Sequence, residues 1–447
     1  MMSKMKVMSI ILIVLIAASA FAGGGQNRAA ASGKTTLNLL YYLEATNPTY
    51  VADGNWVVSE FERLNPDVSI QRENLFSEPY HDKLRAYAAS GNLPDVAYVW
   101  PSGRTGYLQD QKLLKDLMPF VQKDGLTSVF HAYALDPKQQ QGGYLGMIPI
   151  SSTATNTFWY NLEVLNDCGL QPPKTYAELK AQVPVLRAKG YEVILMGAKD
   201  DWVIQSCLFS MIAGRFCGVG WDERIFAGTA KFTDPDFVAG INFIKIMFDD
   251  GVLNRNILGI DYSEVPGLFA SNKYAYMIEG SWRVGPFITD PDTKQALIPP
   301  ARQRNIKIAL FPDIDGVKIN QSNSTILGSG YGMSSANPAG SAKEDASWRL
   351  VKWLTGKEVQ SRWLEHGLFS NASRSDIDLS KMPFEPLQLE MMNLKWSYDT
   401  IVIDGPFGGI IEDECNVGMA EIGMGVKTPQ QVAQDLQRAY DAWKARH

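Results

Sequence analysis

Between residues 37 and 100 the pattern of hydrophobic positions switches repeatedly between the period of a strand and that of a helix. Leu37, Leu39 and Tyr41 alternate with polar residues, as in a strand with one buried face. The elements that the pattern predicts are a strand at 37–41, a helix near 56–61, a strand from 68, a helix near 81–89 and a strand at 96–100. This βαβαβ order is typical of an α/β unit with a largely parallel sheet.

Ligands of such sheets bind beyond the carboxyl ends of the strands. Glu44 follows the first predicted strand, and Trp100 ends the third. We therefore expect both side chains at the edge of the sheet where a ligand would lie.

After residue 160 the pattern of strands and helices starts again. The predicted elements are helices at 175–189, 204–213, 237–248 and 265–269, with strands at 192–196, 274–278 and 306–312. From 336 the chain reads as helical. Three capping boxes are predicted, at Thr175-x-x-Glu178, Thr355-x-x-Glu358 and Thr428-x-x-Gln431. The restart predicts a second α/β lobe, which the chain enters through the segment 144–161.

The N-terminal residues match a secretory signal peptide. Lys4 and Lys6 precede an apolar run over 7–16, and Ala20-Phe21-Ala22 fits a cleavage site. The run is too short to span a bilayer of about 30 Å as a helix. We expect a signal peptide over 1–22, a flexible tether over 23–34 and a periplasmic or secreted protein. No Cys lies near the cleavage site, so no lipid anchor is expected there.

Composition excludes several classes of function. The 447 residues carry a net charge of −6 and no basic run, which argues against a nucleic-acid partner. The four Cys lack metal spacing, so no metal site or cofactor is expected. Cys207 and Cys217 are close enough in sequence for a disulfide, and two buried free thiols are an equal alternative.

Motifs of common enzyme classes are also absent from the sequence. It contains no HExxH, no Walker A motif and no GxSxG elbow. The glycine-rich segment 328–332 lacks the spacing of a phosphate loop and predicts a turn or a close backbone approach. Carboxylate pairs at 200–201 and 412–414 leave a glycosidase open as an alternative, because such enzymes need two nearby carboxylates.

Aromatic residues recur where predicted strands end. Trp100, Trp202 and Trp282 each lie beside Gly, Pro, Ser or Asp, and Tyr331 lies in the glycine-rich segment. Each could instead be a core residue. Flat rings that share an edge with carboxylates and Arg match the needs of a sugar, which offers apolar C–H faces and hydroxyl groups.

Several motifs, taken together and in this order, resemble the extracellular solute-binding proteins of family 1, the sugar-binding components of bacterial ABC importers. The motifs are Leu93-Pro94-Asp95-Val96, Leu113 to Phe120, Gly146-Met147-Ile148-Pro149 followed by Trp159-Tyr160-Asn161, Cys168 to Glu178, Ala275 to Trp282 and Trp353 to Gln360. The resemblance covers nearly the whole mature chain.

This resemblance implies an α/β fold of the periplasmic-binding-protein type II kind, with two lobes, a ligand cleft between them and three hinge crossings. Lobe 1 would be 35–150 plus 331–370, and lobe 2 would be 151–330 plus 371–447, with crossings near 150–158, 325–331 and 369–374. The ligand positions it implies are Glu44, Trp100, Ser102, Asp201, Trp202, Trp282, Tyr331, Arg374 and Phe407.

The expected function is a monomeric, non-enzymatic receptor that binds a mono- or oligosaccharide and delivers it to ABC permease subunits in the membrane. Two alternatives stay open. One is a secreted carbohydrate-active hydrolase, and the other is a receptor of the same fold for a non-sugar solute such as a glycerophosphodiester. A phosphate ligand would favour clustered arginines, and the sequence shows only scattered ones.

Overall fold

The first strand, β1 (Thr35–Tyr42), pairs in parallel with β2 (Val68–Leu75) and β3 (Val96–Val99), as the sequence pattern predicts. This computed structural model describes residues 33–101, 103–369, 371–382 and 398–446. The predicted signal peptide, the tether up to residue 32 and Ser102 lie outside the described residues. Strand β11 (Gly330–Met333) pairs antiparallel both with β3 and with β4 (Met147–Pro149), which completes a sheet of order β2-β1-β3-β11-β4.

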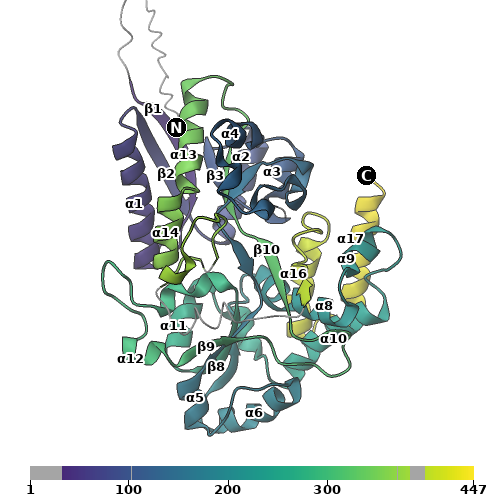
Figure 1. Cartoon of the computed structure of the whole chain (residues 1–447). Helices are drawn as coiled ribbons and strands as arrows, with labels where there is room; N and C mark the ends of the chain where they lie inside the picture. The colour runs from purple at the N-terminus through teal and green to yellow at the C-terminus, as the bar shows by residue number, and fades with distance from the viewer. Residues whose placement is uncertain (1–32, 102, 370, 383–397, 447) are drawn as a thin grey trace, which may run out of the picture. The chain divides into compact units, whose positions relative to one another are not determined.

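Helices cover both faces of this first sheet. Leu37, Leu39 and Tyr41 pack on one face in a core shared with α1 (Pro48–Leu64), α13 (Ala342–Leu354) and α14 (Lys357–Glu365). Leu40 packs on the other face against α2 (Glu78–Ser90) and α3 (Gly106–Asp110). The short helix α4 (Met118–Lys123) joins the first of these cores. Figure 1 shows α1, α13 and α14 together beside β1 and β2.

A second sheet has the order β7-β8-β6-β9. Its strands are β6 (Thr157–Asn161), β7 (Glu192–Leu195), β8 (Tyr274–Glu279) and β9 (Ile306–Ala309). The helices of this half are α5 (Leu162–Asp167), α6 (Tyr176–Ala188), α7 (Trp202–Ile204), α8 (Ser210–Cys217), α9 (Trp221–Phe226), α10 (Pro235–Asp249), α11 (Val265–Ala270), α12 (Pro300–Gln303), α16 (Glu412–Met424) and α17 (Pro429–Lys444). A π-helical turn, Gln205–Phe209, joins α7 to α8.

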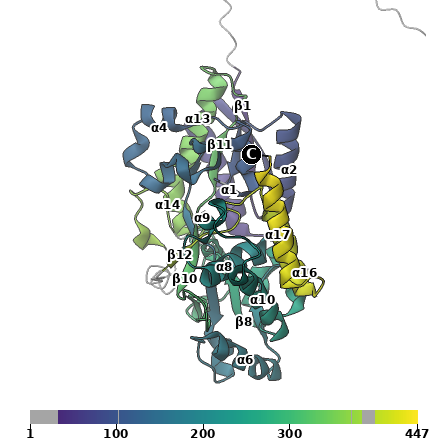
Figure 2. The same cartoon turned by 90° about the vertical axis from the view of Figure 1, so that its right-hand side faces the viewer.

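The second sheet also has a core on each face. The larger core contains Phe158 and Tyr276 and is closed by α10, α16 and α17. Figure 2 shows α16 and α17 side by side next to α8 and α10. The smaller core contains Trp159 and Met277, which face α11. Trp159 is fully buried, so it packs in this core.

Two connecting segments run side by side between the sheets. Strand β5 (Ser152–Ala154) lies between β4 and β6 along the chain and pairs antiparallel with β10 (Ser322–Leu327), which leads into β11. Strand β12 (Tyr398–Thr400) pairs in parallel with β10 on its other side. Residues 371–382, expected in lobe 2, pack differently: Ala372, Ile377 and Met382 belong to the core of the first sheet.

Local signals account for most boundaries of these elements. Thr175 accepts the amide of Glu178, and Thr428 with Gln431 forms a complete capping box. The box expected at Thr355 is wrong, because the Thr355 hydroxyl donates to the Val351 carbonyl and Gly356 precedes α14 instead. Thr355 lies between the end of α13 and the start of α14, and its hydroxyl bonds to the last turn of α13 and not to the first turn of α14.

The glycine-rich segment 328–332 makes the close backbone approach that its composition predicts. Gly330 lies in β11 between β3 and β4, and a Cβ on it would collide with the backbone carbonyl of Ile148. Only glycine fits this position. Tyr331 is buried in the first core next to it.

Of the two alternatives for Cys207 and Cys217, the structure shows free thiols. All four cysteines are free, and three of them, Cys207, Cys217 and Cys415, are buried. No described helix is long and apolar enough to cross a membrane.

Candidate ligand-binding site

A cavity of about 240 Å³ lies where strand ends of the two sheets meet. Five of the sequence-predicted residues line it: Glu44, Trp100, Trp202, Trp282 and Tyr331. Glu44 and Trp100 follow β1 and β3 of the first sheet, whereas Trp282 follows β8 of the second. Residues from distant parts of the chain thus meet at one cavity, as the positions of Glu44 and Trp100 at strand ends predict.

Aromatic rings form much of the wall on the side of the first sheet. Tyr42 stacks on Tyr98, with ring centroids 5.4 Å apart and planes 10° from parallel. Trp100 meets Tyr42 edge-on at 5.3 Å. His81 packs against Trp100 at 4.7 Å, and burial holds its pKa well below the usual range, so the imidazole stays neutral. Trp100 is therefore held by rings on several sides.

Two consecutive hydrogen bonds orient the side chains of the opposite wall. The indole Nε1 of Trp282 donates to the Tyr262 hydroxyl at 2.6 Å, and that hydroxyl donates to Glu279 Oε1 at 3.0 Å. Gly280 allows this arrangement, because a Cβ there would collide with the Trp282 ring. Trp202 packs edge-on against Tyr262 at 4.9 Å, and its Nε1 has no hydrogen-bond partner among the described residues.

An ion pair crosses the cavity from one sheet to the other. Arg283 Nη1 donates to Glu44 Oε2 at 2.8 Å, and the two side chains are only 2% and 4% exposed. The guanidinium lies over the Tyr262 ring at 4.0 Å, donates through Nη2 to the Tyr262 carbonyl, and has Glu279 Oε2 3.6 Å from its Nε. The surrounding negative groups hold the pKa of Arg283 well above its usual range despite burial, so it stays charged.

A second arginine, Arg104, lies at the cavity among carboxyl groups. It bonds to Glu78 and has Glu412 Oε1 3.5 Å from its Nε. Burial, with Asp404 beside it, raises the pKa of Glu412 to about 8. Burial also raises the pKa of Asp404, which lines the cavity, to about 6. Arg104 and Glu412 belong to different halves of the structure, so this contact also joins the two halves.

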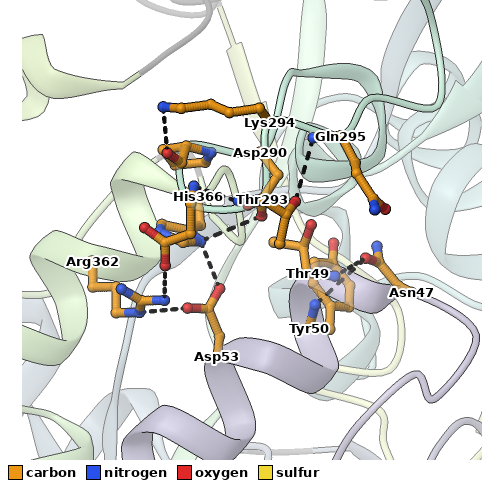
Figure 3. Close-up of polar contacts among 12 residues, drawn as sticks. Asn47, Thr49, Tyr50, Asp53, Asp290, Thr293, Lys294, Gln295, Arg362 and His366 are labelled. Carbon is orange, nitrogen blue, oxygen red and sulfur yellow. Dashed lines mark hydrogen bonds and ion pairs between the residues drawn. The ribbon is translucent and has the colours of Figure 1, made fainter.

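A polar cluster beside the cavity joins the halves at another point. Asp53 on α1 accepts from Arg362 Nε at 2.5 Å and lies 3.0 Å from His366 Nδ1. From the other half, Asp292 accepts from Arg362 Nη2 at 2.6 Å, and Asp290 lies 3.7 Å from His366. Figure 3 shows Arg362 and His366 between Asp53 and the segment that carries Asp290. Contacts between the halves are therefore not confined to the cavity wall.

The sequence model described as "Bacterial extracellular solute-binding protein" matches residues 45–361. The chain belongs to this family. In the described residues, no group of three or more His, Cys, Asp or Glu side chains could hold a metal ion.

Individual relatives are distant in sequence. A maltotriose-binding protein of Pyrococcus abyssi is 23% identical over 67% of this chain and 58% of its own length. A multiple sugar-binding protein of Streptococcus mutans is 22% identical over 53% of this chain and 56% of its own length. The matches thus span little more than half of these relatives.

Among solved structures, a chitin oligosaccharide binding protein matches with a TM-score of 0.79 at 23% identity, and the match covers 92% of this chain and 99% of that one. At this level of identity the similarity shows the fold. It confirms the predicted α/β fold of the type II periplasmic-binding-protein kind for this solute-binding protein.

Three positions expected from the family resemblance are not among the residues that line the cavity. Asp201 is exposed to solvent. Arg374 pairs with Asp376 at 2.9 Å and lies over the Phe130 ring. Phe407 is fully buried and stacks on Phe226 in the large core. A resemblance aligns positions along the chain, but it does not fix which way a loop side chain points.

Sequence reasoning missed several residues that line the cavity. They are Tyr42, Phe76, Arg104, Tyr262, Arg283 and Asp404. Tyr42 and Arg283 lie one or two positions from predicted residues at the same strand ends, so widening each strand-end window would have found them. Arg104 lies in the short 3-10 helix Gly103–Thr105 and Asp404 in a turn, and no sequence signal marks either of them.

Proposed function

We propose that this solute-binding protein is the periplasmic or secreted receptor of an ABC importer, and that it binds a carbohydrate in the cavity between two lobes. The observation that supports this proposal most is the wall itself. Trp100, Trp202 and Trp282 come from both halves of the structure and line the same cavity as charged groups that can bond to hydroxyls. The sugars in the names of the two relatives point to the same ligand class.

In this proposal each kind of side chain has its own task. The tryptophan faces pack against the apolar C–H faces of sugar rings, and Glu44 and Asp404 accept hydrogen bonds from hydroxyl groups. Lobe 1 consists of 35–150 and 331–382, and lobe 2 of 151–330 and 398–447. Because each lobe supplies part of the wall, a bound ligand favours the closed arrangement, which the permease subunits would recognise.

Titration of the intrinsic tryptophan fluorescence with a panel of neutral sugars, repeated by calorimetry, tests the proposal. We expect saturable binding of at least one sugar with a Kd far below about 1 mM. The sugar is expected back unchanged, which chromatography of the mixture checks. No sugar binding below that level, together with saturable binding of a non-sugar solute, would overturn the carbohydrate ligand. Turnover products would overturn the receptor in favour of a hydrolase.

A further inference from the structure

Carboxyl groups that line the cavity or contact its arginines outnumber the cationic side chains that line it. Among the described residues, the cationic side chains that line it are Arg104 and Arg283. Each of them already contacts two carboxyl groups: Glu78 and Glu412 for Arg104, and Glu44 and Glu279 for Arg283. Asp404 adds another carboxyl to the lining, and its Oδ1 has no hydrogen-bond partner among the described residues.

Arg283 is the cation that an anionic ligand would need most, because it is buried at the wall beside Trp282. Its two Nη atoms are already taken, one by Glu44 and the other by the Tyr262 carbonyl, and its flat face is covered by the Tyr262 ring. Its Nε has no hydrogen-bond partner among the described residues but faces Glu279 Oε2 at 3.6 Å, so an anionic group in the cavity would compete with Glu44 for the guanidinium and could displace it. Displacement would leave a buried carboxylate without its cation, which is strongly unfavourable.

We propose that Glu44 sets the charge selectivity of the cleft: by neutralising Arg283 it admits uncharged solutes and excludes anionic ones, such as uronic acids and sugar phosphates. This inference rests on the proposed function and narrows its ligand class. A neutral sugar can donate hydroxyl hydrogens to Glu44 and leave the ion pair in place. An anion instead meets like charge from Glu44 and Asp404 in a cavity walled largely by aromatic rings, where charges are screened less than in bulk water.

Glu44→Gln tests the proposal because it removes one charge and keeps the size of the side chain. Arg283 then keeps Glu279 as its carboxylate partner, and an added anion no longer competes with a carboxylate of Glu44. The matched control is Glu358→Gln, since Glu358 is exposed on α14 and does not line the cavity. Glu279→Gln, which removes the other carboxylate of Arg283, is a second variant in case the first does not fold.

Neutral sugars and their acidic counterparts, such as glucose, glucuronate and glucose 6-phosphate or galactose and galacturonate, are titrated against each protein. We expect the wild type and the control to prefer the neutral member by about a hundredfold or more, and Glu44→Gln to narrow that ratio by about tenfold or more. A wild type that binds an acidic member as tightly as its neutral counterpart would overturn the inference. So would an unchanged ratio in a folded Glu44→Gln.

A second measurement does not require a sugar ligand. Inorganic phosphate at about 10 mM should raise the Tm of Glu44→Gln, because a ligand stabilises the folded state that binds it. The Tm of the wild type and of Glu358→Gln should not move, and Arg283→Met added to Glu44→Gln should abolish the response. If no sugar of either charge binds, the proposed function fails, whereas this phosphate response still decides the role of Glu44. Equal responses in all proteins would refute that role.

Discussion

Arg283 and Glu44 form a 2.8 Å ion pair between residues 239 positions apart, and both side chains are almost completely buried. The pair brings together the ends of β1 and β8, one from each sheet. Burial of two charges is costly, and the cost is offset only while both partners are present.

Removal of Arg283 alone should therefore be strongly destabilising. Arg283→Met leaves Glu44 and Glu279 buried without their cation, and we expect a loss of about 3–5 kcal/mol in the free energy of unfolding. Adding Glu44→Gln should restore part of that loss, because it removes one of the uncompensated charges. Urea unfolding of both single variants and of the double variant measures these values. Strict additivity of the two changes would show that the pair is not coupled.

Trp282 should matter for binding more than for folding. It is half-buried at the cavity, and Trp282→Ala removes a ring face and the donor to Tyr262. We expect affinity for the sugar to fall by about thirtyfold or more, the size of loss seen at central aromatic contacts, with a Tm near that of the wild type.

A control for this variant is Trp353→Phe, which changes a tryptophan on α13 whose indole donates to the Val57 carbonyl away from the cavity. Calorimetric titration and thermal unfolding of both proteins separate the two effects. A large fall in Tm for Trp282→Ala with little change in affinity would indicate a packing role instead.

The raised pKa of Glu412 fixes the direction in which its contribution to the stability of the protein changes with pH. Its pKa of about 8 in the folded protein exceeds the value of about 4.3 for an unfolded Glu, so the folded state binds the extra proton. The stability from this group is complete below pH 4 and is lost as the pH rises through about 8. Glu412→Gln, which mimics the protonated form, should gain stability relative to the wild type as the pH rises. Tm measurements from about pH 5 to 9 test this, with Glu358→Gln as the control.

Asp292 offers a test of the contacts outside the cavity. Asp292→Asn weakens its contact with Arg362 but leaves Asp53 on the same guanidinium. Because Asp292 is half-exposed, we expect only a two- to fivefold loss of sugar affinity, about the value of one surface ion pair, and a smaller loss at high salt. Titration at low and high salt, with Asp378→Asn as an exposed control, measures it. An affinity that does not change at low salt would show that this contact has no influence on binding.

Strand ends could be located from the sequence because hydrophobic period and loop composition are local signals. That sufficed to place Glu44, Trp100 and Trp282 at one cavity. It could not show that Phe407 is inside the large core or that Arg374 pairs with Asp376, because loop side chains follow tertiary packing. The partner of Arg283 was equally hidden, since Glu44 lies 239 residues away in the chain.

The order in which the chain supplies its two largest cores, one in each half, has a consequence for biosynthesis. Trp353 on α13 bonds to the Val57 carbonyl across 296 residues, and Tyr440 on α17 bonds to the Ile225 carbonyl across 215. These two cores are completed only by segments made late, so ribosome-bound or partly exported chains lack the contacts that would close either of them. Such long-range closure slows folding. The emerging polypeptide should thus remain unfolded, and fit for threading through a translocation channel, until most of it has been made.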